Sequence, residues 1–243
     1  MAAGMMSSRH SALPYQVLAG VEPCAGGWLV APGNLQGINL APQPAYVLPA
    51  LAEVLDYRPS FTVIALHAPV GLTDGPDERR GCDVVAKDLL GRRRGAVVAA
   101  PSRKLLDART FEEAKQIDPT LDIVRWRSLP KALEAITEVQ SWRQRSVWEV
   151  NPELAFRQMN EGIELSYGRR SMHGLAERRA LLAARLPGAE RILAERPKGV
   201  REGKLLDALA DLWTARRIVA RAITRLSDPP AWDTDGVRMD IVC

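Results

Sequence analysis

The sequence predicts an α/β fold in which a mixed central sheet, made of an antiparallel hairpin plus parallel strands, is flanked by helices. Three observations predict it. Apolar segments on either side of a glycine turn near the start are typical of a hairpin, the continuous apolar run Phe61–Ala68 is typical of a strand covered on both faces, and the later chain has helical periodicity. The 243 residues are 47% hydrophobic and 26% charged, which indicates a globular chain. We expect a flexible N-terminal tail over 1–14 and a single domain over 15–240.

The first half of the predicted fold is a hairpin, a further strand, a crossover helix and another strand. Glycine allows the positive φ of a tight turn at Ala25-Gly26-Gly27. Leu51, Val54 and Leu55 have helical spacing. The predicted strands are Tyr15–Val21, Trp28–Ala31, one within Leu35–Leu40, and Phe61–Ala68, and the predicted helix is Pro49–Tyr57. This order is that of a ribonuclease-H-like core, in which the first strand and the strand after the helix are adjacent and parallel.

The second half is predicted to be mostly helical. Pro130 suits the first turn of a helix beginning at Ser128, and the segment Ser146–Val150 is predicted to be a strand that ends in Glu149. Asp228-Pro-Pro230 is expected to stop the last helix. The predicted helices are Gly81–Leu90, Thr110–Gln116, Ser128–Arg145, His173–Leu186, Ala189–Glu195 and Glu202–Leu226.

Two predicted strands end on an ionisable residue, Glu22 in the first and His67 in the second. An ionisable group at the end of a buried strand is costly unless it faces a cleft where something binds it. We therefore expect Glu22 and His67 to lie at one edge of the sheet, in a shared site.

Short motifs follow one another in a specific order along the chain. They are Gly20-Val-Glu-Pro-Cys-Ala-Gly-Gly-Trp28, Ile64-Ala-Leu-His-Ala-Pro-Val-Gly-Leu72, Arg80-Gly-Cys-Asp83, Leu90-Gly-Arg92, Pro101-Ser-Arg103, Glu149-Val-Asn-Pro-Glu153, Glu177-Arg178, Leu206-Asp-Ala-Leu209 and Trp213-Thr-Ala215. The ordered set, from about Ala19 to about Met239, resembles the family known as domain of unknown function 429, predicted nucleases of ribonuclease-H fold.

The resemblance implies a carboxylate site for divalent metal and phosphodiester hydrolysis. The family's catalytic positions correspond to Glu22, His67, Glu149 and Asp207, of which Glu22, Glu149 and Asp207, with Asp211, would ligate Mg²⁺ or Mn²⁺ through oxygen. Glu22 and His67 each replace the family's Asp. With neutral His67 the four positions carry −3, too little for two divalent ions, which favours one ion. An imidazole ligand would also shift the preference from Mg²⁺ toward Mn²⁺ or Zn²⁺.

Asp207 and Asp211 lie one turn apart on the predicted last helix, opposite its apolar stripe. Two interpretations remain open for this pair. By periodicity the pair is part of a solvated face, whereas two acids at this spacing can also share a cation. Asp207 matches the family motif and Asp211 does not, so Asp207 is expected to contribute more.

Clustered basic residues indicate a nucleic-acid partner, although the net charge is only +4. With an aromatic fraction of 5%, contact with the phosphate backbone is expected rather than base stacking. The candidate contacts are Arg80, Arg92, Arg93, Arg94, Arg103 and Arg170. No apolar run is long enough to span a membrane and no signal peptide is evident, so we expect a cytoplasmic protein with no membrane partner.

The sequence thus predicts a metal-dependent nuclease with a substituted acidic site. A catalytically degenerate module of the same fold that still binds nucleic acid, or acts in regulation, is the main alternative. A more remote one is an actin-like nucleotide-binding protein whose first hairpin holds phosphate.

Overall fold

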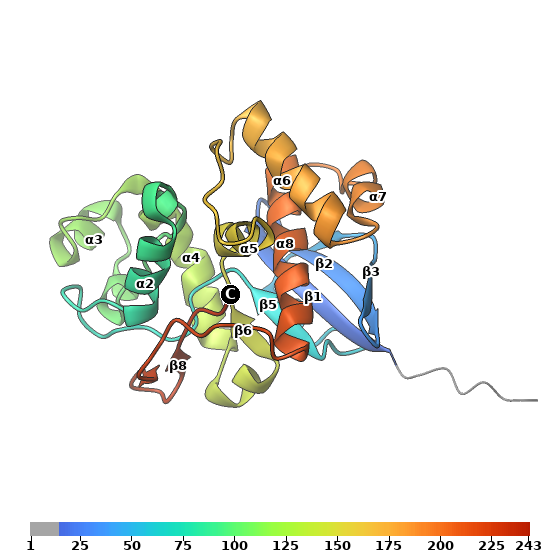
Figure 1. Cartoon of the computed structure of the whole chain (residues 1–243). Coiled ribbons are helices and arrows are strands. Elements are labelled where there is room, and N and C mark those ends of the chain that lie inside the picture. The colour runs from blue at the N-terminus through green and yellow to red at the C-terminus, as the bar shows by residue number, and fades with distance from the viewer. Residues whose placement is uncertain (1–14) are drawn as a thin grey trace, which may run out of the picture.

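The computed structural model describes residues 15–243, and the predicted tail over 1–14 lies outside the described residues. Its centre is a six-stranded mixed sheet with the strand order β3-β2-β1-β5-β6, with β4 also paired to β2 (Figure 1). The strands are β1 (Gln16–Cys24), β2 (Gly27–Gln36), β3 (Asn39–Pro42), β4 (Tyr46–Leu48), β5 (Val63–Leu66) and β6 (Val147–Glu149). Strand β1 is antiparallel to β2 and parallel to β5, which is parallel to β6. The predicted fold class and the adjacency of the first strand and the strand after the helix are confirmed.

Helices cover both faces of this sheet. The longer ones are α2 (Gly81–Leu89), α4 (Ile123–Glu138), α5 (Pro152–Met159), α6 (Met172–Arg185) and α8 (Glu202–Val219), and the shorter ones are α1 (Leu51–Leu55), α3 (Phe111–Ile117) and α7 (Ala189–Ala194). Three 3₁₀ turns lie at Gly91–Ala96, Arg103–Asp107 and Ser141–Arg145, and a two-stranded ribbon is formed by β7 (Ala231–Trp232) and β8 (Arg238–Met239). No helix within residues 15–243 is long and apolar enough to cross a bilayer.

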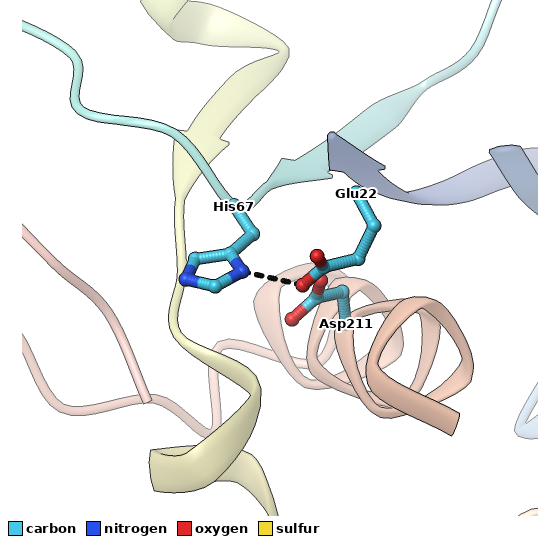
Figure 2. A group of neighbouring side chains, drawn as sticks. All are labelled: Glu22, His67 and Asp211. Atoms are coloured by element: carbon cyan, nitrogen blue, oxygen red, sulfur yellow. Dashed lines mark hydrogen bonds and ion pairs between the residues drawn. The ribbon is translucent and has the colours of Figure 1, made fainter. Parts of the chain in front are cut away.

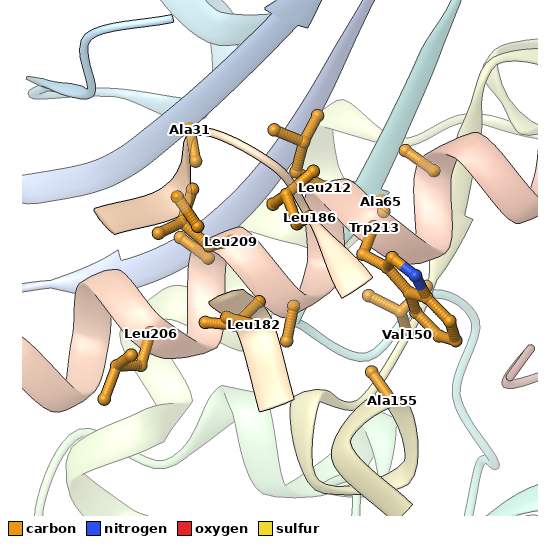
Figure 3. Close-up of a cluster of buried hydrophobic side chains, with 14 of the residues drawn as sticks. Ala31, Ala65, Val150, Ala155, Leu182, Leu186, Leu206, Leu209, Leu212 and Trp213 are labelled. Carbon is orange, nitrogen blue, oxygen red and sulfur yellow. The ribbon is translucent and has the colours of Figure 1, made fainter. Parts of the chain in front are cut away.

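Alternate residues of the strands pack into two separate cores. Leu18 of β1 and Ala65 of β5 face α8 together with residues of α5 and α6, whereas Ala19 and Ile64 face α1 and the end of α4. Figure 3 shows the first core, in which Leu209, Leu212 and Trp213 of α8 pack beside Ala65, Val150 and Leu182. Because the side-chain period of a strand is two, the residues that continue this alternation toward the carboxyl end of β1 and just beyond β5 also point toward α8.

The boundaries of three predicted elements are wrong. The helix predicted from Ser128 begins at Ile123, where the Asp122 side chain accepts from two backbone N–H groups, so Pro130 lies inside α4 and not in its first turn. It ends at Glu138, and 141–145 is a 3₁₀ turn. The last helix ends at Val219 because 224–226 pair instead with the extended C-terminal segment. The third strand is 39–42, after a turn at 37–38, so the prediction within Leu35–Leu40 was misplaced.

Candidate functional site

The side chains of Glu22 and His67 meet at the carboxyl ends of the adjacent parallel strands β1 and β5. Both continue the alternation that faces α8, Glu22 two residues beyond Gly20 and His67 two beyond Ala65. The His67 backbone N–H donates to Val21 (2.9 Å), which extends the parallel pairing by one residue. The ring Nδ1 of His67 hydrogen-bonds Glu22 Oε1, as Figure 2 shows. The predicted meeting of Glu22 and His67 at one edge of the sheet is therefore confirmed.

Helix α8 brings further charged groups to the same place. It packs against β1 at Gly20, where an added Cβ would lie 2.0 Å from the Ala208 carbonyl and 2.3 Å from the Leu212 nitrogen. That close approach lets the buried side chain of Asp211 reach Glu22 and His67 (Figure 2). Among residues 15–243, these three form the group suited to a metal ion, since each offers a ligand atom within 4.8 Å of the others.

Asp211 is fully buried, and neither of its carboxylate oxygens has a hydrogen-bond partner in the described structure. Burial, together with the neighbouring carboxylates of Glu22 and Asp207, raises the pKa of Asp211 well above its ordinary value. Without a cation, this side chain therefore holds a proton that it can share with Glu22. A metal ion that displaced the proton would satisfy the bare oxygens.

Glu22 is also fully buried, yet it stays ionised. Burial alone would raise the pKa of Glu22, but His67 and Lys204 outweigh it and lower that pKa to about 2. The Lys204 ammonium lies 2.7 Å from Oε2 of Glu22, whereas His67 contacts Oε1. The two oxygens of Glu22 thus face two different partners, the His67 ring and the Lys204 ammonium.

Asp207 lies beside this group but is already paired. Its Oδ2 accepts a hydrogen bond from the Arg169 guanidinium at 3.0 Å. Burial and the charge of Glu22 raise the pKa of Asp207 to about 6, against the opposing effect of Arg169 and Lys204. The sequence pattern that placed Asp207 and Asp211 on a solvated face is wrong, because both are buried on a helix covered by the sheet on one side and by α5 and α6 on the other.

Glu149 belongs to a second, neighbouring charge cluster. Its Oε2 accepts from the Val70 backbone N–H and from the buried Arg80 guanidinium, both at 2.7 Å. Burial raises the pKa of Glu149 to about 7, with a smaller contribution from Asp83 and against the opposing charge of Arg80. The predicted ligand Glu149 is therefore held by Arg80, and the group of Glu22, His67 and Asp211 forms without it.

A cleft of about 1370 Å³ connects these groups to solvent. Its lining includes His67, Lys204, Arg169 and Glu149, and its opposite wall is the helical segment 81–132. The predicted phosphate contacts Arg92, Arg93, Arg94 and Arg170 line it as well. Arg80 lines it from a buried position, whereas Arg103 is held outside it by ion pairs to Asp74, Asp233 and Asp235.

Sequence reasoning missed the cations of the site. Lys204 and Arg169 were not among the predicted site residues, although Lys204, Asp207 and Asp211 have the i, i+3, i+7 spacing of one helix face. It also missed the buried pair in which both oxygens of Glu153 accept from Arg178 at 2.6 Å, which joins α5 to α6. The helix-face spacing was a usable signal for Lys204, whereas Arg169 follows only from the tertiary fold.

The geometry can be set beside known proteins. No curated protein and no solved structure matches the chain. A family model does match, over residues 20–231, and its description reads Protein of unknown function (DUF429). These residues cover every strand end and helix that carries the site. The chain belongs to that family.

Proposed function

We propose that the protein is a metal-dependent nuclease that hydrolyses phosphodiester bonds at the centre formed by Glu22, His67 and Asp211. The observation that carries the proposal is the Asp211 carboxylate, which is fully buried without a hydrogen-bond donor beside a second carboxylate. A buried bare carboxylate costs several kcal/mol unless a cation or a proton compensates it. Two oxygen donors and one imidazole nitrogen in reach of one another make a cation the compensating group that the chemistry favours.

The donor set suits one ion. An ion about 2.1 Å from each ligand atom spans donors up to about 4.2 Å apart, so a group within 4.8 Å needs only a small contraction. One imidazole among the ligands favours Mn²⁺ or Zn²⁺ over Mg²⁺. Such an ion, when bound, would activate water for attack and stabilise negative charge on a phosphate.

The protein's own residues then orient and enclose the reaction. Glu22, Asp211 and the Nδ1 side of His67 hold their positions through β1, β5 and α8, while His67, with 22% of its side chain exposed, faces the cleft and the substrate. The basic residues along the cleft would bind the phosphate backbone on either side of the bond that is cleaved. The contacts favour Asp211 over Asp207 as the principal ligand, the reverse of the order expected from the motif, because Asp207 is paired with Arg169.

A nuclease assay tests the proposal. Labelled single- and double-stranded DNA and RNA are incubated with the native chain in Mn²⁺, Mg²⁺, Zn²⁺ or EDTA. We expect cleavage that requires a divalent ion and falls by about a hundredfold or more in Asp211→Asn, since metal-assisted charge stabilisation contributes several kcal/mol. Asp88→Asn is the matched control, because Asp88 is an exposed acid of the same cleft outside the group.

The outcomes separate the three candidate functions. Retained nucleic-acid binding with no cleavage of any substrate in any ion would favour the catalytically degenerate module. Cleavage that survives Asp211→Asn would remove Asp211 from the centre. Binding of nucleotide in place of nucleic acid would favour the actin-like alternative.

A further inference from the structure

Glu22 presents its two carboxylate oxygens to two separate positions. Oε1 contacts His67, which together with Glu22 and Asp211 forms the proposed metal-binding group, and Oε2 faces the Lys204 ammonium at 2.7 Å. In two-metal phosphodiesterases a bridging carboxylate holds one ion on each oxygen, with the ions about 3.5–4 Å apart. At Glu22 the second of these positions is taken by an ammonium group that belongs to the protein.

The charges of the site lead to the same conclusion. Glu22, Asp207 and Asp211 contribute −3 and the paired Lys204 and Arg169 contribute +2, so the site carries −1 when all three carboxylates are ionised. One divalent ion changes that sum to +1, whereas two would change it to +3. A buried site with that excess of positive charge is unfavourable, because the low dielectric strengthens the repulsion.

The position of Lys204 at the start of a helix is unfavourable for a cation unless an acidic partner such as Glu22 lies beside it. It lies in the first turn of α8, where the helix dipole disfavours a cation. Its side chain is 28% exposed and lines the cleft. The one hydrogen bond that the Lys204 ammonium makes within residues 15–243 is to Glu22, and an ammonium group has three donors, so two remain to meet a ligand in the cleft.

We propose that Lys204 is a catalytic cation that replaces the second metal ion: the site binds one divalent ion, and the Lys204 ammonium contacts the substrate phosphate where a second ion would otherwise bind. This inference rests on the proposed metal centre of Glu22, His67 and Asp211. Lys204 donates hydrogen bonds to a non-bridging phosphate oxygen and keeps its proton, so it stabilises charge and takes no part in proton transfer.

Metal stoichiometry tests this inference without relying on turnover. Mn²⁺ is titrated calorimetrically into the native chain, Lys204→Gln, Lys204→Met and Lys204→Arg, with Lys198→Gln as a control at an exposed lysine outside the cleft. We expect one ion per chain in the native protein, in Lys204→Arg and in the control. Without the positive charge, Lys204→Gln and Lys204→Met should either bind a second ion or bind the first ion at least about tenfold more tightly.

Two further measurements give independent readings of the same variants. Electron paramagnetic resonance should show an isolated Mn²⁺ signal in the native chain and an exchange-coupled pair in any neutral variant that binds two ions. Cleavage by Lys204→Gln should fall at least tenfold at low Mn²⁺ and recover partly at high Mn²⁺ as the second ion enters, which a merely structural role would not produce. Melting curves confirm that each variant is folded, and Lys204→Met keeps the unbranched stem if Lys204→Gln is unstable.

Each failure has a different signature. A native chain that binds two ions, or neutral variants that bind one ion with unchanged affinity, would overturn the role of Lys204 and leave the proposed metal centre intact. A native chain that binds no ion would overturn the metal centre and the role of Lys204 together.

Discussion

The carboxyl group of Glu149 is buried beneath Arg80, and its protonation should be visible in the stability of the whole chain. Burial raises the pKa of Glu149 from 4.5 to about 7. Below pH 4.5 the group is protonated in both the folded and the unfolded chain. As the pH rises toward 7, the unfolded chain loses the proton first, which favours unfolding.

We therefore predict that Glu149 lowers the free energy of unfolding as the pH rises from about 4.5 to about 7, by an amount on the order of 3 kcal/mol. Asp207, whose pKa is raised to about 6, acts in the same direction over a lower range, so the comparison must be with a variant. Urea denaturation in EDTA should show a smaller decline for Glu149→Gln than for the native chain. Asp88→Asn, at an exposed position, should keep the native profile, and an equal decline in Glu149→Gln would mean that Glu149 is ionised throughout.

For single residues, the sequence predicted which side chains reach the sheet edge better than it predicted which side chains they contact. Glu22 and His67 were predictable because each ends an apolar strand, and the parallel pairing of β1 and β5 then brings them together. The different environments of Asp207 and Asp211 were not predictable. Both are acids on one helix face. They differ only in the tertiary structure, where Asp207 is paired with Arg169 and Asp211 has no hydrogen-bond partner.

The contact between β1 and α8 sets the geometry of the centre at the scale of whole elements. Glu22 is on the strand, whereas Asp211 and Lys204 are on the helix, so the distance between the two elements fixes the distances between these groups. Gly20 is what permits the contact, because any Cβ there would overlap the Ala208 carbonyl at 2.0 Å. The obstructing atoms are backbone atoms, which cannot rotate away.

We predict that Gly20→Ala lowers the free energy of unfolding by roughly 1–3 kcal/mol or more, the usual cost of overpacking a core. It should also weaken Mn²⁺ binding, because α8 must move away from Glu22. Urea denaturation and calorimetry measure the two effects. Gly81→Ala is the control, since Gly81 opens α2 with nothing within 4 Å of an added Cβ and alanine favours a helix. Native stability and native Mn²⁺ affinity in Gly20→Ala would show that the close approach is not required.

The error over α8 is also an error at the scale of elements. The apolar positions of the last helix were read as one stripe with a polar face opposite, as for a helix on the surface. In the structure α8 lies between the sheet and the helices α5 and α6, so both of its sides are buried. Periodicity identifies a helix but does not reveal how many neighbours cover it, and a carboxylate on the second buried face is then a functional signal and not a solvated one.

Over the whole molecule, the cleft is lined both by residues at the sheet edge that carries the proposed centre and by residues of the segment inserted between β5 and β6, which contains α2, α3 and α4. The basic residues on the margin of the cleft differ in whether they are already paired within the protein. Arg92 pairs with Glu164 and Arg93 donates to the Leu165 carbonyl, which ties 91–96 to the loop before α6. Arg94 and Arg170 are exposed and form no ion pair within residues 15–243, so they are the arginines best placed to meet a phosphate backbone.

We predict that the combined variant Arg94→Ala with Arg170→Ala weakens nucleic-acid binding and flattens its salt dependence. Each phosphate contact contributes about 0.7–0.9 to the slope of log affinity against log salt, so losing two should reduce the slope by roughly 1.4–1.8. Fluorescence anisotropy of a labelled oligonucleotide, titrated between about 50 and 200 mM salt, measures both quantities.

Arg109→Ala with Lys198→Ala removes the same charge from exposed positions that do not line the cleft. Equal flattening in both double variants would mean that net charge alone attracts the nucleic acid, and an unchanged slope in the Arg94 and Arg170 variant would place the binding surface elsewhere. Loss confined to the cleft variant, with single-turnover cleavage restored at saturating protein, would instead show that Arg94 and Arg170 hold the backbone and are not needed for the cleavage step itself.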